Sequence, residues 1–239
     1  MEPSSQEETF LLQPHHPIFR KAAEALDDEG IPVVEYGQQL EWRHGDPVVL
    51  LLVEWAVPDE MLSRSSQILS DRGFFCERPS TRDTDRYGPW ERGGKIHKLH
   101  GGFKLLLYPL SFVGISLQDT VEVISTFDRR RKILTPTPRM YMESLIGHLL
   151  DHPVGDCIRC RVEEFLLSFI SFYILREEPL NTKEGEWDDQ ESEEDFQKRA
   201  GDAIIKMKTW DWNASGKNYL SIAESVVRNC QSIAKLSSH

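Results

Sequence analysis

The sequence predicts an α+β protein, with a mixed sheet and flanking helices first and a helical half after it. Two observations predict this order. Up to about residue 125, short β-branched and apolar runs alternate with helical patterns, which is typical of a βαβ or split α+β unit. From Pro138 onward, apolar residues recur at helical spacing. The chain has 239 residues, enough to bury a core without disulfides.

The first elements follow a polar leader at residues 1–17, which carries three prolines and is expected to be flexible. Apolar residues then recur every fourth position and predict an amphipathic helix over 18–30. A short β-branched strand is expected at 32–36, ended by Gly37, and one or two helical turns at 38–43. The sheet therefore begins with a strand, a glycine turn and a helix.

A nearly continuous apolar run at residues 47–57 is interrupted only by Glu54. It predicts a central strand buried on both faces, and it is too short to span a membrane. The elements expected after it are a helix, a strand, a long polar loop and two more strands, at 58–72, 74–78, 79–95, 96–100 and 103–117. The last of these runs into a turn near Pro109. One mixed sheet of four or five strands accounts for this half of the chain.

The C-terminal half is expected to hold four helices, over about 138–150, 158–177, 193–209 and 217–236. An acidic stretch lies before the third helix, with eight carboxylates in twelve residues and no base: Glu184, Glu186, Asp188, Asp189, Glu191, Glu193, Glu194 and Asp195. Because like charges repel and bury little surface, residues 181–195 are predicted to be an exposed linker, unless Trp187 is buried. The expected divisions are a leader at 1–17, an α+β domain at 18–135 and a helical region at 136–239.

Charge and composition exclude several classes of partner. The formal net charge is -11, but without the eight clustered carboxylates 28 basic residues face 31 acidic ones. This near-neutral remainder argues against an extensive nucleic-acid surface, and the basic cluster Arg129–Lys132 is interpreted as surface solvation. The absence of a signal pattern, a membrane span or a disulfide framework predicts a protein of the cytoplasm or nucleus. Composition leaves the oligomeric state open.

The motifs in the sequence give only weak candidates for a functional site. The chain has no phosphate loop, dinucleotide turn, nucleophile elbow or zinc-protease helix. Cys157 and Cys160 have zinc-ligand spacing, and two imidazoles, His97 and His100, could complete a tetrahedral site. Residues three apart on a strand point to opposite faces, so no metal site is predicted. The aspartate pair at 83–85 could hold Mg²⁺, but its flanking arginines favour a salt-bridged loop.

The most ordered stretch of the sequence begins Gly30-Ile31-Pro32-Val33-Val34-Glu35-Tyr36-Gly37-Gln38-Gln39-Leu40. It continues with Asp46-Pro47, the buried strand, Val57-Pro58-Asp59 and a helix ending Ser70-Asp71-Arg72-Gly73-Phe74. Further matches lie at Lys98-Leu99-His100, at 106–111 and at 136–150. This order resembles the nucleotidyltransferase-fold proteins, in particular an uncharacterised group of filamentous-fungal proteins, over about residues 18–150.

The resemblance implies a turn that cradles phosphate and two carboxylates, one residue apart on the next strand, that bind two Mg²⁺. Here the turn reads Gly37-Gln38 without a second small residue, and the strand has Glu54 but Leu52 where its partner would stand. A two-metal clamp needs several oxygen ligands. No cofactor is therefore predicted, and Mg²⁺ is expected only if nucleotidyltransferase activity survives.

The leading hypothesis is a non-catalytic or degenerate nucleotidyltransferase-like protein that acts by binding a small molecule or nucleotide in its cleft. Its expected binding residues are Gly37, Gln38 and Asp59. Glu54 is interpreted as a structural carboxylate near the end of the strand, reaching Arg43 or a backbone amide, because a lone buried charge is costly.

Two other classes of function stay open. One is a small-molecule enzyme of a specialised (secondary) metabolic pathway. Its acid–base candidates are Glu54, His97 and His100, with Asp59 beside them. The other is an interaction protein whose acidic stretch docks a basic partner.

Overall fold

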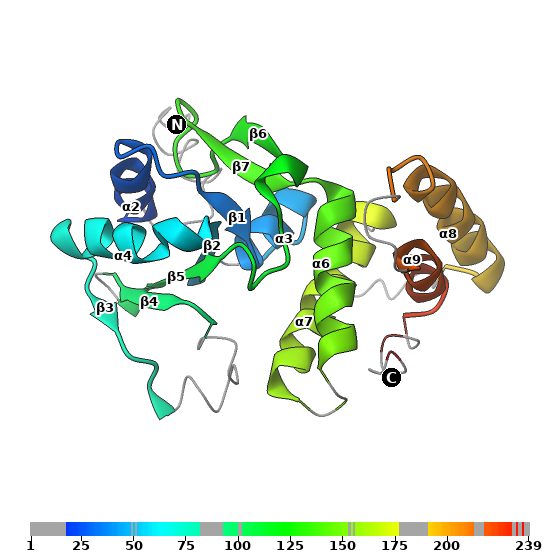
Figure 1. Ribbon diagram of the computed structural model, residues 1–239. Helices are drawn as coiled ribbons and strands as arrows, with labels where there is room; N and C mark the ends of the chain where they lie inside the picture. Colours follow the sequence, from blue (N-terminus) through cyan, green and yellow to red (C-terminus); the bar gives the residue numbers. More distant parts are fainter. Residues whose placement is uncertain are drawn as a thin grey trace, which may run out of the picture. The chain divides into compact units, whose positions relative to one another are not determined.

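The structure is a computed structural model, and it describes residues 18–48, 50, 52–81, 93–99, 102–152, 154, 156–176, 191–212, 218–230, 233 and 236. The chain divides into two compact units, Met1–Arg43 with Val48–Thr137, and His44–Pro47 with Pro138–His239. The first unit holds the sheet and the second is helical (Figure 1).

The first unit is built on a seven-stranded mixed sheet, with the strand order β3-β4-β5-β2-β1-β7-β6. The strands are β1 (Val34–Tyr36), β2 (Leu52–Val57), β3 (Cys76–Glu77), β4 (Lys95–Lys98), β5 (Lys104–Pro109), β6 (Thr120–Ile124) and β7 (Lys132–Pro136). The pairs β2–β5 and β1–β7 are parallel, and the other four pairs are antiparallel. The expected α+β class with a mixed sheet is therefore confirmed.

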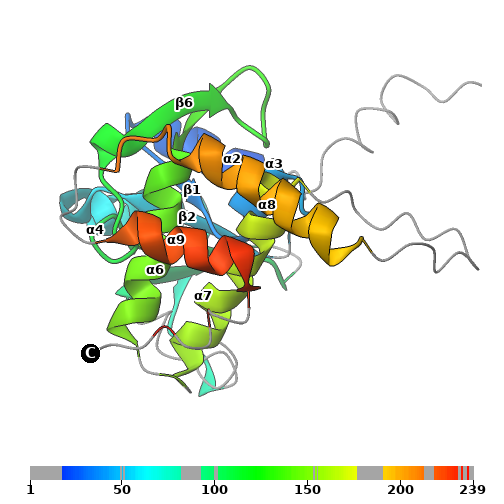
Figure 2. The ribbon, with the colours of Figure 1, turned by 90° about the vertical axis from the view of Figure 1, so that its right-hand side faces the viewer.

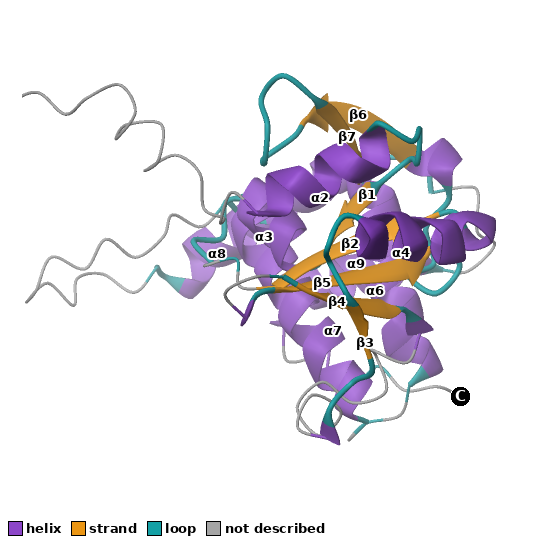
Figure 3. Ribbon diagram, turned by 90° about the vertical axis from the view of Figure 1, so that its left-hand side faces the viewer, coloured by secondary structure: helices purple, strands orange, loops and turns teal. Residues whose placement is uncertain are grey.

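Helices α2 (Ile18–Asp27) and α4 (Leu62–Asp71) cover one face of this sheet (Figure 3). Their apolar residues pack on alternate residues of the two central strands. These strand residues are Val53, Trp55, Val57, Leu105 and Leu107. Since side chains alternate along a strand, Leu52, Glu54 and Ala56 belong to the other face of β2. All six residues of β2 are buried, which explains the apolar run in the sequence.

The expectation of four or five strands was too low, because β6 and β7 follow the five strands that the pattern indicates. Strand β6 lies at the edge of the sheet and most of its residues are exposed. Its sequence, Thr120-Val121-Glu122-Val123-Ile124, is rich in the β-branched residues that favour strands, so this strand was missed although its sequence indicates it. One expected strand was also too long, because β2 begins at Leu52 rather than 47. Strand β5 ends at Pro109, and the turn expected near Pro109 follows it.

The second unit contains four α-helices in its described part: α6 (Pro138–Asp151), α7 (Cys157–Ser168), α8 (Glu193–Met207) and α9 (Tyr219–Arg228). Helix α7 continues into a π-helical segment, Phe169–Ile174, and α8 and α9 lie side by side (Figure 2). No helix among the described residues is both long and apolar enough to span a bilayer.

The end of the acidic stretch is helical. Ser192 caps α8 by accepting a hydrogen bond from the Asp195 amide, and Glu193, Glu194 and Asp195 form the first turn. Carboxylates are stabilised at a helix N-terminus by the helix dipole. The expected linker therefore does not reach 195. Residues 177–190, with Trp187, lie outside the described residues.

Candidate functional site

The glycine turn and the lone acid of the central strand meet in the structure. Strands β1 and β2 pair Tyr36 with Glu54, so the next residue, Gly37, lies beside the Glu54 side chain. Gly37 has a φ of +58°, and a Cβ atom there would lie 2.6 Å from Glu54 Cδ. Glycine is required twice, for its backbone conformation and for the space that the carboxylate fills.

The Glu54 carboxylate is held in the interior of the protein. Its side chain has no exposed surface, and its Oε1 accepts a hydrogen bond of 3.1 Å from the Tyr108 hydroxyl of β5. From the sequence, Glu54 was expected to reach Arg43 or a backbone amide. In the structure Arg43 instead binds Glu35. The reason is register: Glu35 faces the opposite side of the sheet from Glu54, and Arg43 extends to that side.

These residues do not fit a two-metal centre. Glu54 shares its face of β2 with Leu52 and Ala56, which offer no oxygen ligand. Mg²⁺ prefers an octahedral shell of carboxylate, phosphate and water oxygens, whereas Glu54 is fully buried and bonded to Tyr108. Among the residues that the structure describes, no three His, Cys, Asp or Glu side chains gather as metal ligands. The pair at 83–85 lies outside them.

His97 faces away from Glu54. Its strand partner is Leu105, part of the core under α2 and α4. Its Nδ1 lies 2.6 Å from the Phe74 carbonyl oxygen, and its Nε2 lies 3.0 Å from Ser66 Oγ on α4. Since a carbonyl only accepts, Nδ1 carries the proton and Ser66 donates to Nε2. Burial lowers the pKa of His97, so the neutral ring links α4 to the sheet.

Two other predicted site residues, Asp59 and Gln38, are described by the structure. Asp59 follows β2, and its carboxylate accepts hydrogen bonds from the Ser111 amide, at 3.1 Å, and from the Ser111 hydroxyl. These bonds lower the pKa of Asp59. Gln38 begins helix α3 (Gln38–His44) and is half-buried. His100 lies outside the described residues. Of the predicted residues, the structure thus brings together Gly37 and Glu54.

A buried polar network on the opposite face was missed by the sequence analysis. Glu35 has no exposed surface and accepts hydrogen bonds of 2.9 Å from Gln39 Nε2 and Arg43 Nη2. Gln39 Oε1 accepts from the Trp55 indole at 2.7 Å, and Arg43 Nη2 also donates to the Ile124 carbonyl at 3.1 Å. Burial raises the pKa of Glu35, against the pull of Arg43. The spacing of four puts Gln39 and Arg43 on one face of α3, but their contact with Glu35 of β1 depends on the turn at Gly37 between the strand and the helix.

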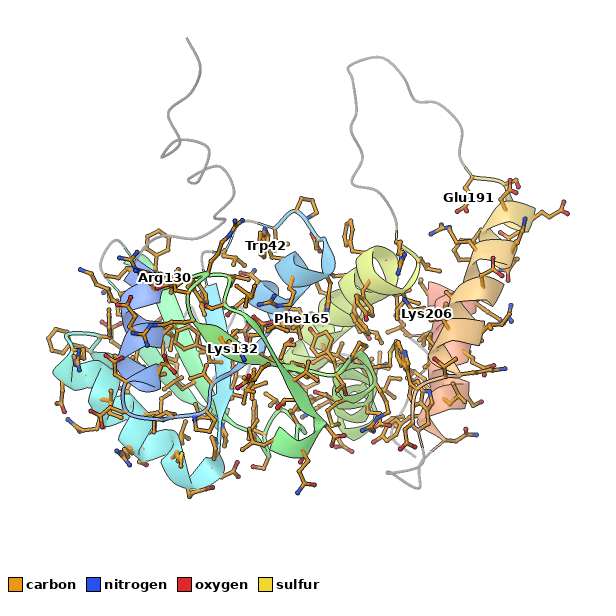
Figure 4. All side chains as sticks on the ribbon, turned by 90° about the horizontal axis from the view of Figure 1, so that it is seen from above. Trp42, Arg130, Lys132, Phe165, Glu191 and Lys206 are labelled. Atoms are coloured by element: carbon orange, nitrogen blue, oxygen red, sulfur yellow. The ribbon has the colours of Figure 1, made fainter. Side chains whose placement is uncertain are left out.

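A pocket of about 240 Å³ lies against α2, the segment 31–33 and the β6–β7 hairpin. Six charged residues from α2 and the hairpin line it: Arg20, Asp27, Glu122, Asp128, Arg131 and Lys132. The basic cluster Arg129–Lys132 was interpreted as surface solvation, yet Arg131 and Lys132 line this pocket and Arg130 binds Asp128. Figure 4 labels two residues of this cluster, Arg130 and Lys132. The first unit therefore has a second candidate site, separate from Glu54.

The chain is similar to two solved structures. One is the solution structure of the antibiotic-resistance factor ANT(2'')-Ia, at 14% identity and a TM-score of 0.40, covering 69% of this chain and 94% of that chain. The other is the crystal structure of an antigenic nucleotidyltransferase-like protein from Paracoccidioides brasiliensis, at 14% identity and a TM-score of 0.46, covering 92% and 91%. No protein-family model and no curated protein matches. Neither similarity assigns a role to a residue of this chain.

Proposed function

We propose that this chain is a degenerate nucleotidyltransferase-like protein of the cytoplasm or nucleus that acts by binding a small molecule and does not transfer nucleotides. The order strand, glycine turn, helix and strand supports the family, because β1, Gly37, α3 and β2 follow one another as the resemblance implies. The observation that carries the proposal is the state of Glu54, a single carboxylate buried against Gly37 and Tyr108.

Glu54 acts in this proposal as a structural group. To reach a metal ion or a phosphate, the carboxylate would have to give up the Tyr108 hydroxyl and leave the space over Gly37. A buried carboxylate that loses its hydrogen-bond partner costs about 1 to 3 kcal/mol or more. The space over Gly37, in the turn to which the resemblance assigns phosphate, is filled by the Glu54 side chain.

The direct test combines turnover with calorimetry. Purified protein is mixed with ATP or CTP and Mg²⁺, and pyrophosphate release and binding heat are both measured. We expect neither metal-dependent turnover nor a heat that requires Mg²⁺. Pyrophosphate release that depends on Mg²⁺ and disappears in a Glu54→Gln variant would overturn the proposal.

The second test asks what Glu54 does for the fold. Glu54→Gln keeps the shape of the side chain and removes its charge, so we expect the free energy of unfolding to fall by about 1 to 3 kcal/mol through altered hydrogen bonds. Glu60→Gln, at an exposed position after β2, is the matched control and should change it by less than about 0.5 kcal/mol. A Glu54→Gln protein that melts like the wild type but loses a bound ligand would return Glu54 to a site for catalysis or binding.

The rival small-molecule enzyme would need Glu54, His97 and Asp59 to act on one substrate. His97 contacts α4 on the opposite face of the sheet, and Asp59 binds the Ser111 loop. If a catalytic group were lost in Glu54→Gln, activity would fall at least about a hundredfold. A thermal-shift screen of metabolite mixtures detects either a substrate or a bound ligand, because binding to the native state raises the melting temperature.

A further inference from the structure

The pocket against α2 and the β6–β7 hairpin has the size of a small metabolite. Its volume is about 240 Å³. Since a water molecule takes about 30 Å³ in the liquid, this volume equals roughly eight waters. It therefore suits a ligand of about ten non-hydrogen atoms, and a nucleoside triphosphate is far too large to enter it whole.

The lining joins an apolar surface to a balanced set of charges. The apolar part comes from α2, the segment after it and β7: Ala23, Ile31, Pro32, Val33, Ile133 and Leu134. The charged part comprises three cations, Arg20, Arg131 and Lys132, and three anions, Asp27, Glu122 and Asp128. Ligand pockets typically combine an apolar lining with a few charged groups that orient the ligand.

The charges around the pocket are held in ion pairs between neighbouring elements. Arg131 of the hairpin binds Asp27 and Asp28 at the end of α2, and Lys132 binds Glu122 across the two strands at 2.6 Å. These groups are between 33% and 70% exposed. Exposed ion pairs contribute little to stability, so a ligand can open one of them at little cost.

Asp128 is the fixed anion of the pocket. It is 8% exposed and accepts hydrogen bonds from the Arg130 side chain, at 3.0 and 2.9 Å, and from the Arg130 amide, at 3.0 Å. The hydrogen bonds from Arg130, together with the charges of Arg130 and Arg20, lower the pKa of Asp128 to about 2. The carboxylate is therefore ionised at neutral pH.

Asp128 and Arg131 sit on one tight turn, closed by a hydrogen bond of 3.0 Å from the Arg131 amide to the Asp128 carbonyl. Both residues line the pocket, so one turn of the chain supplies an anion and a cation to its wall. A ligand that pairs with both groups must carry an ammonium and a carboxylate group close together, as on one carbon atom.

We infer that this pocket binds a small zwitterion with an apolar side chain, an α-amino acid of about the size of leucine. The ligand carboxylate takes Arg131, its ammonium group takes Asp128, and its side chain covers the apolar surface around Ala23. A ligand with one charge would pair with only one of these two groups and give the pocket a net charge, whereas a zwitterion pairs with both and leaves the pocket neutral.

This inference rests on the proposed function in that the protein acts by binding, but it uses residues remote in sequence from Glu54. The two can fail separately. Mg²⁺-dependent nucleotidyl transfer would overturn the proposed function and leave the amino-acid pocket intact. Absence of amino-acid binding would overturn this inference and leave the structural role of Glu54 intact.

The experiment is a calorimetric titration of the full chain with L-leucine, isocaproate and isoamylamine. Isocaproate is leucine without its amino group, and isoamylamine is leucine without its carboxylate. We expect leucine to bind with a Kd below about 1 mM and each single-charge analogue to bind at least about tenfold more weakly. No saturation by leucine up to about 10 mM, or equal binding of isocaproate, would overturn the inference.

Variants of the lining residues test whether leucine binds in this pocket. Arg131→Gln removes the carboxylate partner, and Ala23→Leu fills the pocket without changing charge or helix propensity; each should weaken leucine binding at least about tenfold. Arg129→Gln removes the same charge from an exposed neighbour outside the pocket lining and should bind like the wild type. Because Arg131→Gln also opens the link to Asp27, Ala23→Leu keeps the test valid if the first variant is unstable. Leucine binding unaffected by Ala23→Leu would overturn the assignment to this pocket.

Discussion

Replacing Gly37 with alanine tests the contact on which the reading of Glu54 depends. The new Cβ would meet two costs. A residue with a side chain at a φ of +58° loses about 1 to 2 kcal/mol relative to glycine. The Cβ would also lie 2.6 Å from Glu54 Cδ and 3.3 Å from Glu54 Cβ, so the carboxylate must move away from Tyr108, at about 1 to 3 kcal/mol.

The expected loss for Gly37→Ala is therefore about 2 to 5 kcal/mol in the free energy of unfolding. Gly30→Ala is the matched control, because Gly30 has a φ of +67° and nothing within 4 Å of its virtual Cβ. It should show the backbone cost alone, about 1 to 2 kcal/mol. Urea denaturation monitored by fluorescence gives both values from the midpoints at an unchanged m-value.

A double-mutant cycle isolates the contact. In a Glu54→Ala background the carboxylate is gone, so Gly37→Ala should cost no more than Gly30→Ala does. The coupling energy between positions 37 and 54 is then about 1 to 3 kcal/mol. If the two substitutions add within about 0.5 kcal/mol, or if Gly37→Ala costs only what the control costs, then Glu54 does not pack on Gly37 and the argument for its structural role fails.

Two further predictions concern side chains whose roles the structure assigns to stability. Burial lowers the pKa of His97 below its ordinary 6.5, so its contribution to the free energy of unfolding is present above pH 6.5 and is lost as the pH falls toward the folded-state pKa. In urea denaturation between about pH 5 and 7.5, His97→Gln should therefore lose less stability at low pH than the wild type does. An unchanged pH profile would contradict this prediction. Arg159, 1% exposed, donates to the Leu149, His152 and Ile233 carbonyls at 2.6, 3.1 and 2.7 Å, so Arg159→Met should destabilise the protein by at least about 2 kcal/mol, because it leaves buried carbonyls without donors. Arg228→Met, at an exposed position, is its control. Equal losses in the free energy of unfolding for the two variants would show that the bonds of Arg159 to the carbonyls at the end of α6 do not stabilise the protein.

Local patterns were sufficient for most helices and for the central strands. Helix α2 carries its buried residues Phe19, Ala22 and Leu26 at helical spacing, so its amphipathic period appears in any short window of the sequence. Strand β2 is buried on both faces and reads as an apolar run for that reason. The α+β class follows from such windows, because burial imposes a period that nearby residues share.

Residues far apart in the sequence decide three other features: the place of β6 and β7 in the sheet, the side of the sheet that His97 faces, and the second pocket. The β-branched residues of β6 indicate a strand, but only its pairing with β7 fixes its place at the edge of the sheet. His97 is a buried structural ring because α4 supplies Ser66, 31 residues before it. Arg131 reaches Asp27 across 104 residues, and the pocket between their elements exists only once helix and hairpin are packed. Register and packing decide which polar residues meet, and a periodic pattern contains no information on either.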